Sequence, residues 1–425
     1  IRGNGERLDA RPWKDDVEIV IGDVLIPDTL TRAMDGIDVA YYLIHSMGGQ
    51  NGFSKRDIQA ATNFAAAARD AGVQNIIYLG GLGDPGSNLS EHLRSRQETG
   101  AALRQFDVPV TEFRAGMVVG SGSLSFEMMR HLTERLPLMV APRWVFTKTQ
   151  PIAIRDVLNY LVSALQNQAS TGQTIEIGGA NILTYADMMM TYARIRGLQR
   201  LIIRVPVLTP RLSSYWVHWI TPVPAGIATP LVEGLRNELI VRDHSASTLF
   251  PTVKPLDFES ALRLALGRIE DGDIETVWSD ALSSSKGDIK PLHLTQEQGM
   301  LIERRQQQVS AKPEIVFRAF SGLGGERGWP PHNWLWQVRG AIDRLLGGVG
   351  MRRGRRHPDR LRQGEALDFW RVEKVEPDHL IRLRAEMKLP GEGWLQFEAN
   401  EGQDGGTELV QTAYFAPKGL FGLLY

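Results

Sequence analysis

Apolar and polar positions follow two different patterns along the chain. Up to about residue 180, short apolar runs alternate with longer segments of helical periodicity, which is typical of βαβ units and a parallel sheet. The apolar runs that predict strands lie at residues 17–21, 39–44, 75–79 and 110–113. A long helix is predicted over residues 54–71, because Ala61, Ala65 and Ala68 recur at three- and four-residue spacing.

The pattern changes in the last third of the chain. Residues 283–288 are small and polar, so we predict a linker there. Beyond it, strands are predicted at residues 367–375, 380–387, 394–399 and 408–415. The breaks between these strands contain Pro, Gly and Asp, which favours hairpins and an antiparallel meander. The predicted fold class is therefore α/β, with a doubly wound parallel sheet in a domain at residues 1–282, followed by an α+β domain at residues 291–425.

Composition excludes several classes of function. The 425 residues include 48 Lys plus Arg and 49 Asp plus Glu, and a net charge this close to zero argues against a nucleic-acid binder. Cysteine is absent, which excludes disulfides, thiolate metal sites and a cysteine nucleophile. The sequence contains neither a zinc-protease motif nor a phosphate-binding loop for nucleoside triphosphates, so we expect no metal.

The most apolar segment of the chain, residues 205–232, is interrupted by five prolines. Each proline removes a backbone donor, so this segment does not have the character of a bilayer-spanning helix. We interpret it as a buried or cavity-lining segment, and a patch that contacts a membrane surface is the alternative. The sequence thus favours a cytoplasmic protein, with peripheral membrane contact as the other option.

Three short motifs stand in an order that is known from one family. Gly22 and Asp23 follow a predicted strand, residues 114–120 read Arg-Ala-Gly-Met-Val-Val-Gly, and residues 151–157 read Pro-Ile-Ala-Ile-Arg-Asp-Val. On these motifs the first domain resembles an atypical short-chain dehydrogenase/reductase of the extended, NmrA-like kind. The resemblance implies a Rossmann-like fold that binds NADP or NAD, with Asp23 near the adenine. The cofactor contacts that it implies are Asp23, Leu43, His45, Gly80, Gly81, Arg96 and Arg114.

The glycine-rich loop that cradles the pyrophosphate in this family is missing. Its glycines follow the first strand and let backbone amides approach the phosphates, whereas Gly3 and Gly5 stand where the second strand should end. We therefore expect the chain to begin after the first strand and helix, with about 35–45 residues absent by analogy with the fold. Arg2 and Arg7 lie near the point where a 2′-phosphate would bind, which slightly favours NADP.

The Tyr-x-x-x-Lys pair of the family's oxidoreductases is replaced here by His92 and Arg96. Their four-residue spacing puts both on one helix face, so the resemblance assigns His92 the role of proton donor and Arg96 that of a fixed positive charge. We expect the charge of Arg96 to lower the pKa of His92. The alternative is a helix that contacts the cofactor without chemistry. Gly80 and Gly81 favour this alternative, because the preceding strand then ends without a hydroxyl to hold a substrate carbonyl.

In the last third of the chain, helices are predicted at residues 313–320 and 335–346, before the meander of strands. This arrangement resembles a helix-grip (START-like, SRPBCC) domain, whose long gripping helix should begin within residues 415–425 and would be cut off by the end of the chain. Such a domain encloses an apolar cavity. The tryptophans that either line this cavity or pack in the core are Trp329, Trp334, Trp336, Trp370 and Trp394.

Arginines crowd into one short segment of the last third of the chain. They are Arg352, Arg353, Arg355, Arg356, Arg360 and Arg362. A run of this kind is typical of a solvated loop, and contact with an anionic group is the alternative.

Together these features predict an NAD(P)-dependent reductase- or epimerase-like protein that acts on a hydrophobic small molecule. The alternative is a non-catalytic protein that senses NAD(P) or binds a lipid or other ligand. The sequence leaves open whether the protein is an enzyme, which substrate it takes and how many copies assemble.

Overall fold

The computed structural model describes residues 8, 13–45, 53–84, 86, 89–205, 225–270, 301–330, 332–402 and 406–417. The chain divides into two compact units, one containing Ile19–Trp278 with Ile1–Gly3, the other Ser279–Tyr425 with Asn4–Glu18. The predicted linker at residues 283–288 lies outside the described residues, so its position stays a prediction.

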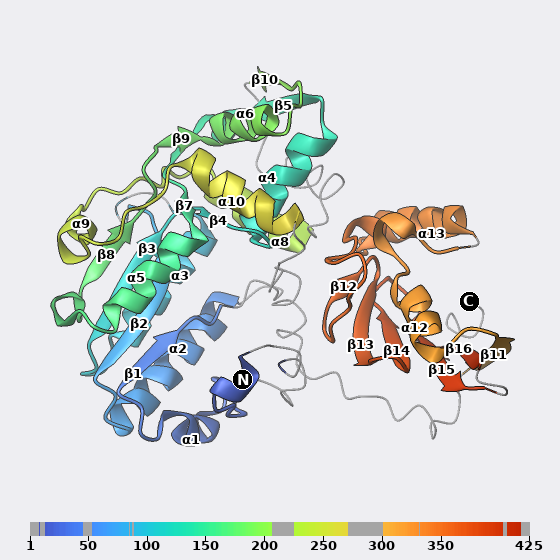
Figure 1. Cartoon of the computed structure of the whole chain (residues 1–425). Helices are drawn as coiled ribbons and strands as arrows, with labels where there is room; N and C mark the ends of the chain where they lie inside the picture. Colours follow the sequence, from blue (N-terminus) through green and yellow to red (C-terminus); the bar gives the residue numbers. More distant parts are fainter. Residues whose placement is uncertain are drawn as a thin grey trace. The chain divides into compact units, whose positions relative to one another are not determined.

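The first unit is built on a parallel sheet, as the sequence predicts, although only three of its four strands match the predicted runs (Figure 1). The strands are β1 (Val39–Tyr42), β2 (Asn75–Gly81), β3 (Val110–Ala115) and β8 (Thr174–Ile177), in the order β1-β2-β3-β8. Each neighbouring pair is parallel. The core strand β2 is apolar on both faces because helices cover both sides of the sheet.

The apolar run at residues 17–21 was also predicted as a strand, and this prediction is wrong. An extended segment becomes a strand only when a neighbour accepts its backbone hydrogen bonds. Among the described residues no strand pairs with this run, and Val17 and Ile21 are exposed.

Helices cover both faces of the sheet, and alternate side chains of β2 contact the helices on opposite faces. Ile76 and Tyr78 point to one face, where they pack with α2 (Phe53–Asp70) and the end of α3 (Glu91–Leu103). Ile77 points to the other face and packs with α5 (Ile154–Ala164). In α2 the predicted alanine stripe is buried, because it lies against the sheet.

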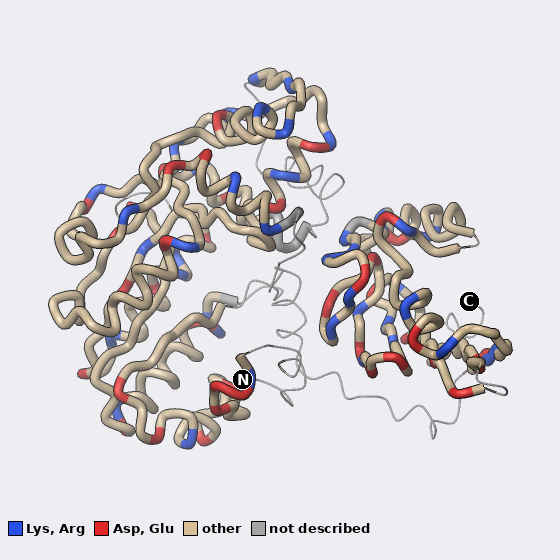
Figure 2. The backbone as a smooth tube through the Cα atoms, viewed as in Figure 1, with Lys and Arg blue, Asp and Glu red and all other residues tan. Residues whose placement is uncertain are grey.

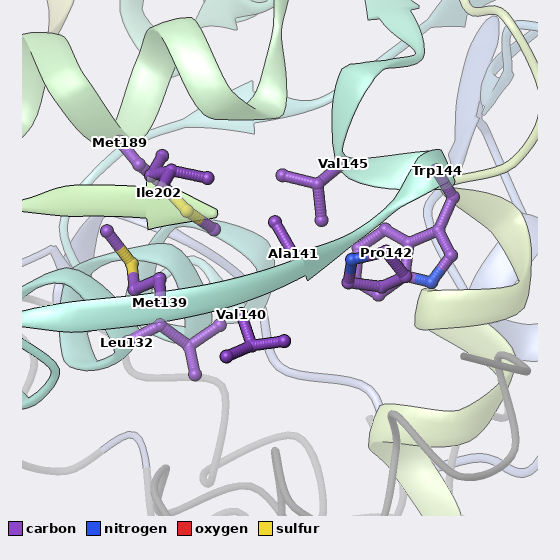
Figure 3. Close-up of a pocket in the computed structure, with 9 residues that line it drawn as sticks. All are labelled: Leu132, Met139, Val140, Ala141, Pro142, Trp144, Val145, Met189 and Ile202. Carbon is purple, nitrogen blue, oxygen red and sulfur yellow. The ribbon is translucent and has the colours of Figure 1, made fainter. Parts of the chain in front are cut away.

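The first unit contains further helices and strands, some of which pack against this sheet. They are α1 (Leu30–Met34), β4 (Val118–Val119), α4 (Leu124–Arg135), β5 (Leu138–Pro142), β6 (Lys148–Thr149), β7 (Ile152–Ala153), β9 (Leu183–Thr184), α6 (Tyr185–Ile195), β10 (Leu201–Val205), α8 (Ala225–Gly234), α9 (Ser245–Leu249) and α10 (Phe258–Glu270). Strands β5 and β10 pair in parallel. Apolar side chains from these two strands, α4 and α6 enclose a cavity of about 20 Å³, which is too small for an organic ligand (Figure 3).

The second unit is built on an antiparallel sheet of six strands. They are β11 (Leu301–Val309), β16 (Thr407–Pro417), β15 (Gly391–Glu401), β14 (Leu380–Ala385), β13 (Trp370–Glu376) and β12 (Ala366–Leu367), in that order across the sheet. The predicted meander is thus confirmed, and β11 is an additional strand. The predicted helices are present as α12 (Pro313–Ser321) and α13 (Asn333–Leu345). Residues 415–417 continue β16, and the rest of the expected gripping helix lies outside the described residues.

Of the five tryptophans predicted to line a cavity or pack in the core, three pack together in the core of this unit. The rings of Trp329, Trp336, Phe369 and Trp370 have centroids 5.1 to 6.5 Å apart. Trp394 is buried and donates Nε1–H to Glu373 at 3.3 Å. Trp334 is 62% exposed on α13 and therefore lines no interior cavity.

Two central residues of the arginine run, Arg353 and Arg356, are buried in ion pairs, which corrects both interpretations for these two residues, whereas Arg360 is exposed. Arg353 forms an ion pair with Glu386, and Arg356 forms one with Glu365; the two arginine side chains are each only 6% exposed. Arg371 approaches the same Glu386 carboxylate at 3.0 Å. Figure 2 shows acidic and basic positions mixed along this unit. The sequence displayed the density of positive charge but not the carboxylates that neutralise it.

Among the described residues, no helix has both the length and the apolar character needed to cross a bilayer. Of the apolar segment at residues 205–232, the described part includes the end of β10 and most of α8. In that part Val232 is buried and Leu231 lines a cavity, but residues 206–224 lie outside the described residues, so the interpretation of the whole segment stays a prediction.

Candidate functional site

A cavity of about 350 Å³ lies at the carboxyl ends of β2 and β3, where open α/β sheets bind their ligands. Its apolar walls are Leu79, Leu93, Ala115, Met117, Val118, Leu124, Leu231, Leu235 and Leu239. Its glycines are Gly80, Gly81, Gly116 and Gly234, and its polar side chains are His45, His92, Arg96, Ser123, Ser125 and Tyr185. Segments that are far apart in sequence, from the end of β1 to the residues after α8, thus meet around one space.

His45 reaches the cavity from the loop that follows β1. Its Nδ1 lies 3.0 Å from Oδ2 of Asp57, a residue of α2 that is 2% exposed. A carboxylate only accepts hydrogen bonds, so Nδ1 carries the proton and the neutral ring keeps its lone pair on Nε2. Nε2 is buried and has no hydrogen-bond partner among the described residues. The contact with Asp57 therefore fixes the orientation of the imidazole through Nδ1, and Nε2 is left for a ligand in the cavity.

His92 lies in the first turn of α3, beside His45. The two ring centroids are 5.1 Å apart. Burial, followed by the charges of His45 and Arg96, lowers the pKa of His92 to about 3. The predicted repulsion by Arg96 is thus present, but burial is the larger cause. Burial also lowers the pKa of His45, although its hydrogen bond to Asp57 opposes this shift. Both imidazoles are therefore neutral at pH 7.

Arg96 lies one turn after His92 on the same face of α3, and both residues line the cavity as their spacing predicts. The guanidinium donates a hydrogen bond to the carbonyl of Leu79 and lies over the ring of Tyr78, at 5.3 Å from the centroid. The hydroxyl of Tyr78 in turn donates to the backbone carbonyl of Arg96 at 2.8 Å. These contacts fix the positive charge in the wall of the cavity.

The start of α3 is fixed by contacts on both sides of its first turn. Ser90 is the N-cap, and its hydroxyl accepts a hydrogen bond from the amide of Leu93. The amide of Ser90 donates to the side chain of Asn237, just after α8, at 3.2 Å. The position of His92 thus depends on contacts with a segment far along the chain.

Four of the seven residues expected to contact the cofactor line this cavity, namely His45, Gly80, Gly81 and Arg96. A Cβ atom at Gly80 would lie 2.9 Å from Oε1 of Glu112, so glycine leaves the room that this strand end needs. The roles of these residues stay predictions.

The other three expected residues are not among those that line the cavity. Asp23 belongs to a turn, where its carboxylate accepts from the amide of Leu25 at 2.9 Å. Leu43 is 58% exposed. Arg114 donates to the buried carboxylate of Glu112 at 2.8 Å, so its charge is neutralised within the sheet.

Sequence reasoning missed several polar residues of the site. Asp57 carried a usable signal, because it lies four residues before Ala61 in the buried stripe of α2, and a carboxylate in an apolar stripe is unusual. Ser123, Ser125 and Tyr185 had no such signal. They bring hydroxyls to the cavity, which the end of β2 itself does not provide.

Comparison with protein families identifies an NAD(P)H-binding domain at the start of the chain, since residues 1–109 match the family model described as NAD(P)H-binding. Residues 297–425 match a separate model described as a protein of unknown function, DUF2867. The expectation of an NADP or NAD cofactor is thus confirmed at the level of the domain. No curated protein matches the chain.

Several solved structures are similar to the chain. A nucleoside-diphosphate-sugar epimerase from Staphylococcus aureus is 17% identical, with 62% of this chain and 88% of that chain covered at a TM-score of 0.49. The triphenylmethane reductase of Citrobacter sp., complexed with NADP(H), is 19% identical over 61% of this chain and 88% of that chain, with a TM-score of 0.48. An NADPH-dependent quinone oxidoreductase from Escherichia coli is 17% identical over 61% and 87%, also with a TM-score of 0.48.

Proposed function

We propose that this protein, whose first unit begins with an NAD(P)H-binding domain, is an NAD(P)H-dependent reductase or epimerase-like enzyme that acts on a hydrophobic small molecule. The observation that carries the proposal is the cavity at the carboxyl ends of β2 and β3, with apolar walls and two neutral imidazoles. A volume of about 350 Å³ lies within the range of small-molecule sites.

The chemistry of the walls supports an apolar substrate. Burying a charged group against leucine, methionine and valine side chains costs free energy unless a partner compensates it. Among the residues that line the cavity, Arg96 alone carries a permanent charge, and that charge is held by Leu79 and Tyr78. A neutral substrate with a polar carbonyl or quinone oxygen is therefore the class that fits.

The same residues fit the reactive end of a nicotinamide cofactor. Gly80 and Gly81 line the cavity at the strand end, and the buried Nε2 of His45 offers a hydrogen-bonding group to a ligand. When bound, the cofactor supplies or takes up a hydride. The chain's own residues exclude water, orient the substrate and hold a proton near it.

The second unit, in the same proposal, is a START-like helix-grip domain that binds a hydrophobic ligand. Support comes from the order of its elements, in which α12 and α13 precede the antiparallel meander from β12 to β16. Mass spectrometry of small molecules that co-purify with the chain tests this point. An apolar compound retained by residues 291–425 supports it, and a compound retained only by the first unit contradicts it.

The test of the enzyme is to measure NADPH and NADH binding by calorimetry and then their oxidation with a panel of quinones, enones and ketones. We expect binding and turnover, and both should weaken in Leu235→Trp, which fills the cavity. Leu158→Ser, at an exposed position of α5, serves as the control. Binding without any turnover would favour the non-catalytic alternative, and absence of dinucleotide binding would overturn the proposal.

A further inference from the structure

The stability of the fold does not explain why a buried carboxylate, Asp57, lies beside His45. Asp57 lies in the apolar stripe of α2 and is 2% exposed, so its carboxylate is removed from water. Such a group costs free energy unless it is hydrogen-bonded, and an alanine like its neighbours would avoid that cost. Nδ1 of His45 lies at 3.0 Å and the hydroxyl of Ser95 at 3.5 Å from the same oxygen. The carboxylate therefore serves to hold one imidazole.

The orientation of His45 is that of a general acid and base. A proton carrier needs one nitrogen fixed by a partner and the other within reach of the reacting atom. The carboxylate of Asp57 meets the first requirement at Nδ1. The second is met at Nε2, which is buried, has no partner among the described residues and belongs to a ring that lines the cavity.

His92 lacks the equivalent support. Within the described part of the chain, no carboxylate is hydrogen-bonded or ion-paired to it, and the charge of Asp57, which favours its protonation, acts less strongly on it than burial, His45 and Arg96. A proton on His92 would add a positive charge beside another one, whereas a proton on His45 would lie against Asp57. Of the two imidazoles, His45 is thus the one that can become charged at lower cost.

We infer that His45, oriented by Asp57, exchanges the proton with the substrate, and that His92 is a neutral positioning residue beside it. The inference rests on the proposed function. In reduction, the substrate carbon accepts a hydride from the reduced nicotinamide, and the substrate oxygen accepts the proton from Nε2 of the His45 imidazolium. The C=O group becomes CH–OH, NAD(P)H becomes NAD(P)⁺, and neutral His45 takes a new proton from solvent. In oxidation, neutral Nε2 accepts the proton of the alcohol.

The test compares turnover by the full chain and its variants with an acceptor that the wild type reduces. His45→Gln should lower turnover by roughly 10²–10⁴-fold, the usual contribution of acid–base catalysis, while the Kd for NAD(P)H stays near the wild-type value. His92→Gln should lower it by a smaller factor. His379→Gln, a histidine exposed on the second unit, is the matched control and should be unchanged.

Asp57→Asn tests the positioning role through the pH profile. The groups that face His45 are Asp57 on α2 and His92 and Arg96 on α3, so removing the carboxylate leaves only neutral or positive neighbours. The pH at which reduction loses its protonated donor should therefore shift downward in Asp57→Asn. If His45→Gln does not fold, the pH profile of Asp57→Asn tests the inference by itself.

The outcomes separate the two proposals. A wild type that binds cofactor but reduces no acceptor defeats the proposed function, and the inference with it. A wild type that turns over while His45→Gln keeps full activity defeats the inference alone. An unchanged pH profile in Asp57→Asn also defeats it, because a purely structural aspartate would not affect that profile.

Discussion

In the second unit Arg353 and Arg371 share the buried carboxylate of Glu386, whereas in the first unit the buried carboxylate of Asp57 is hydrogen-bonded to an imidazole. Burial alone would raise the pKa of Glu386, but the charges of the two arginines outweigh it and lower the pKa to about 2. Such a pair keeps its charges throughout the neutral range. The imidazole beside Asp57 can gain or lose a proton. The two carboxylates thus differ in role: Glu386 holds two fixed cations, whereas Asp57, in our inference, orients an imidazole that exchanges a proton.

Lowering the pH should produce the largest difference in stability between the two units. Burial is the first cause that lowers the pKa of His92 and of His131 in the first unit to about 3, from about 6.5 when unfolded. Between these values the unfolded chain binds more protons, so the free energy of unfolding falls as the pH falls below 6.5, by roughly 4 kcal/mol for His92 alone. Glu386 stabilises the second unit fully above about 4.5, its unfolded value, and that contribution is lost as the pH falls towards 2.

Hydrogen exchange followed by mass spectrometry, corrected for intrinsic rates, can follow each unit from pH 7 to pH 4. We expect the first unit to lose protection first, and His92→Gln to reduce that loss. A second unit that loses protection above pH 4.5 while the first stays protected would contradict the comparison.

Removing the shared carboxylate of the second unit should have the next largest effect. Glu386→Gln leaves Arg353 and Arg371 buried without their counter-charge, and breaking a buried pair in this way costs about 3–5 kcal/mol of unfolding free energy. Urea unfolding followed by tryptophan fluorescence reports on the Trp329–Trp336–Trp370 cluster in the same unit.

The control for this change is Glu303→Gln, which removes an exposed ion pair with Arg305 on β11. Surface pairs of this kind contribute about 0–1 kcal/mol, so its midpoint should stay near the wild type. If both variants unfolded at the same urea concentration, the buried arginines would have found other partners.

The smallest expected effect concerns the cap of α3. Ser90→Ala removes the hydroxyl that accepts from the amide of Leu93, and loss of such a cap costs about 1 kcal/mol. Ser163→Ala, inside α5, is a matched exchange without a side-chain cap and should cost nothing. Thermal unfolding of the first unit measures both. Equal melting temperatures for the two variants would mean that Asn237 and the packing of α3 hold the helix start without the cap.

The parts of the fold that could be predicted are those whose pattern is local. Strand β2 is apolar on both faces and α2 repeats alanine on one face, so these parts of the parallel sheet and its cover could be predicted from the sequence. Strand β11 was not, because Leu301–Val309 is almost entirely exposed and becomes a strand through pairing with β16. Its hydrogen-bonding partner lies about a hundred residues away in sequence, beyond the reach of any local pattern.

In the candidate site, too, local features could be predicted from the sequence, whereas contacts between distant segments could not. His92 and Arg96 were identified because they stand where the family that the first domain resembles has its Tyr-x-x-x-Lys pair, and both line the cavity. The contact between His45 and Asp57 joins the loop after β1 to α2, and no periodicity displays it. Likewise, the arginine run was visible in the sequence, but the carboxylates that pair with Arg353 and Arg356, Glu386 and Glu365, lie in other segments.

The hydrogen bond between Ser90 and Asn237 has a consequence for the order in which the protein forms during synthesis. It spans 147 positions, and α8 and the residues after it supply one wall of the cavity. A ribosome that adds about 5–20 residues per second needs on the order of 10 s to pass from α3 to that wall. During this interval the nascent chain carries α3 and the strand ends with apolar side chains such as Leu79 and Leu93 uncovered on that side. The site therefore closes only after α8 has been made, while α9 and α10 of the same unit are still to follow.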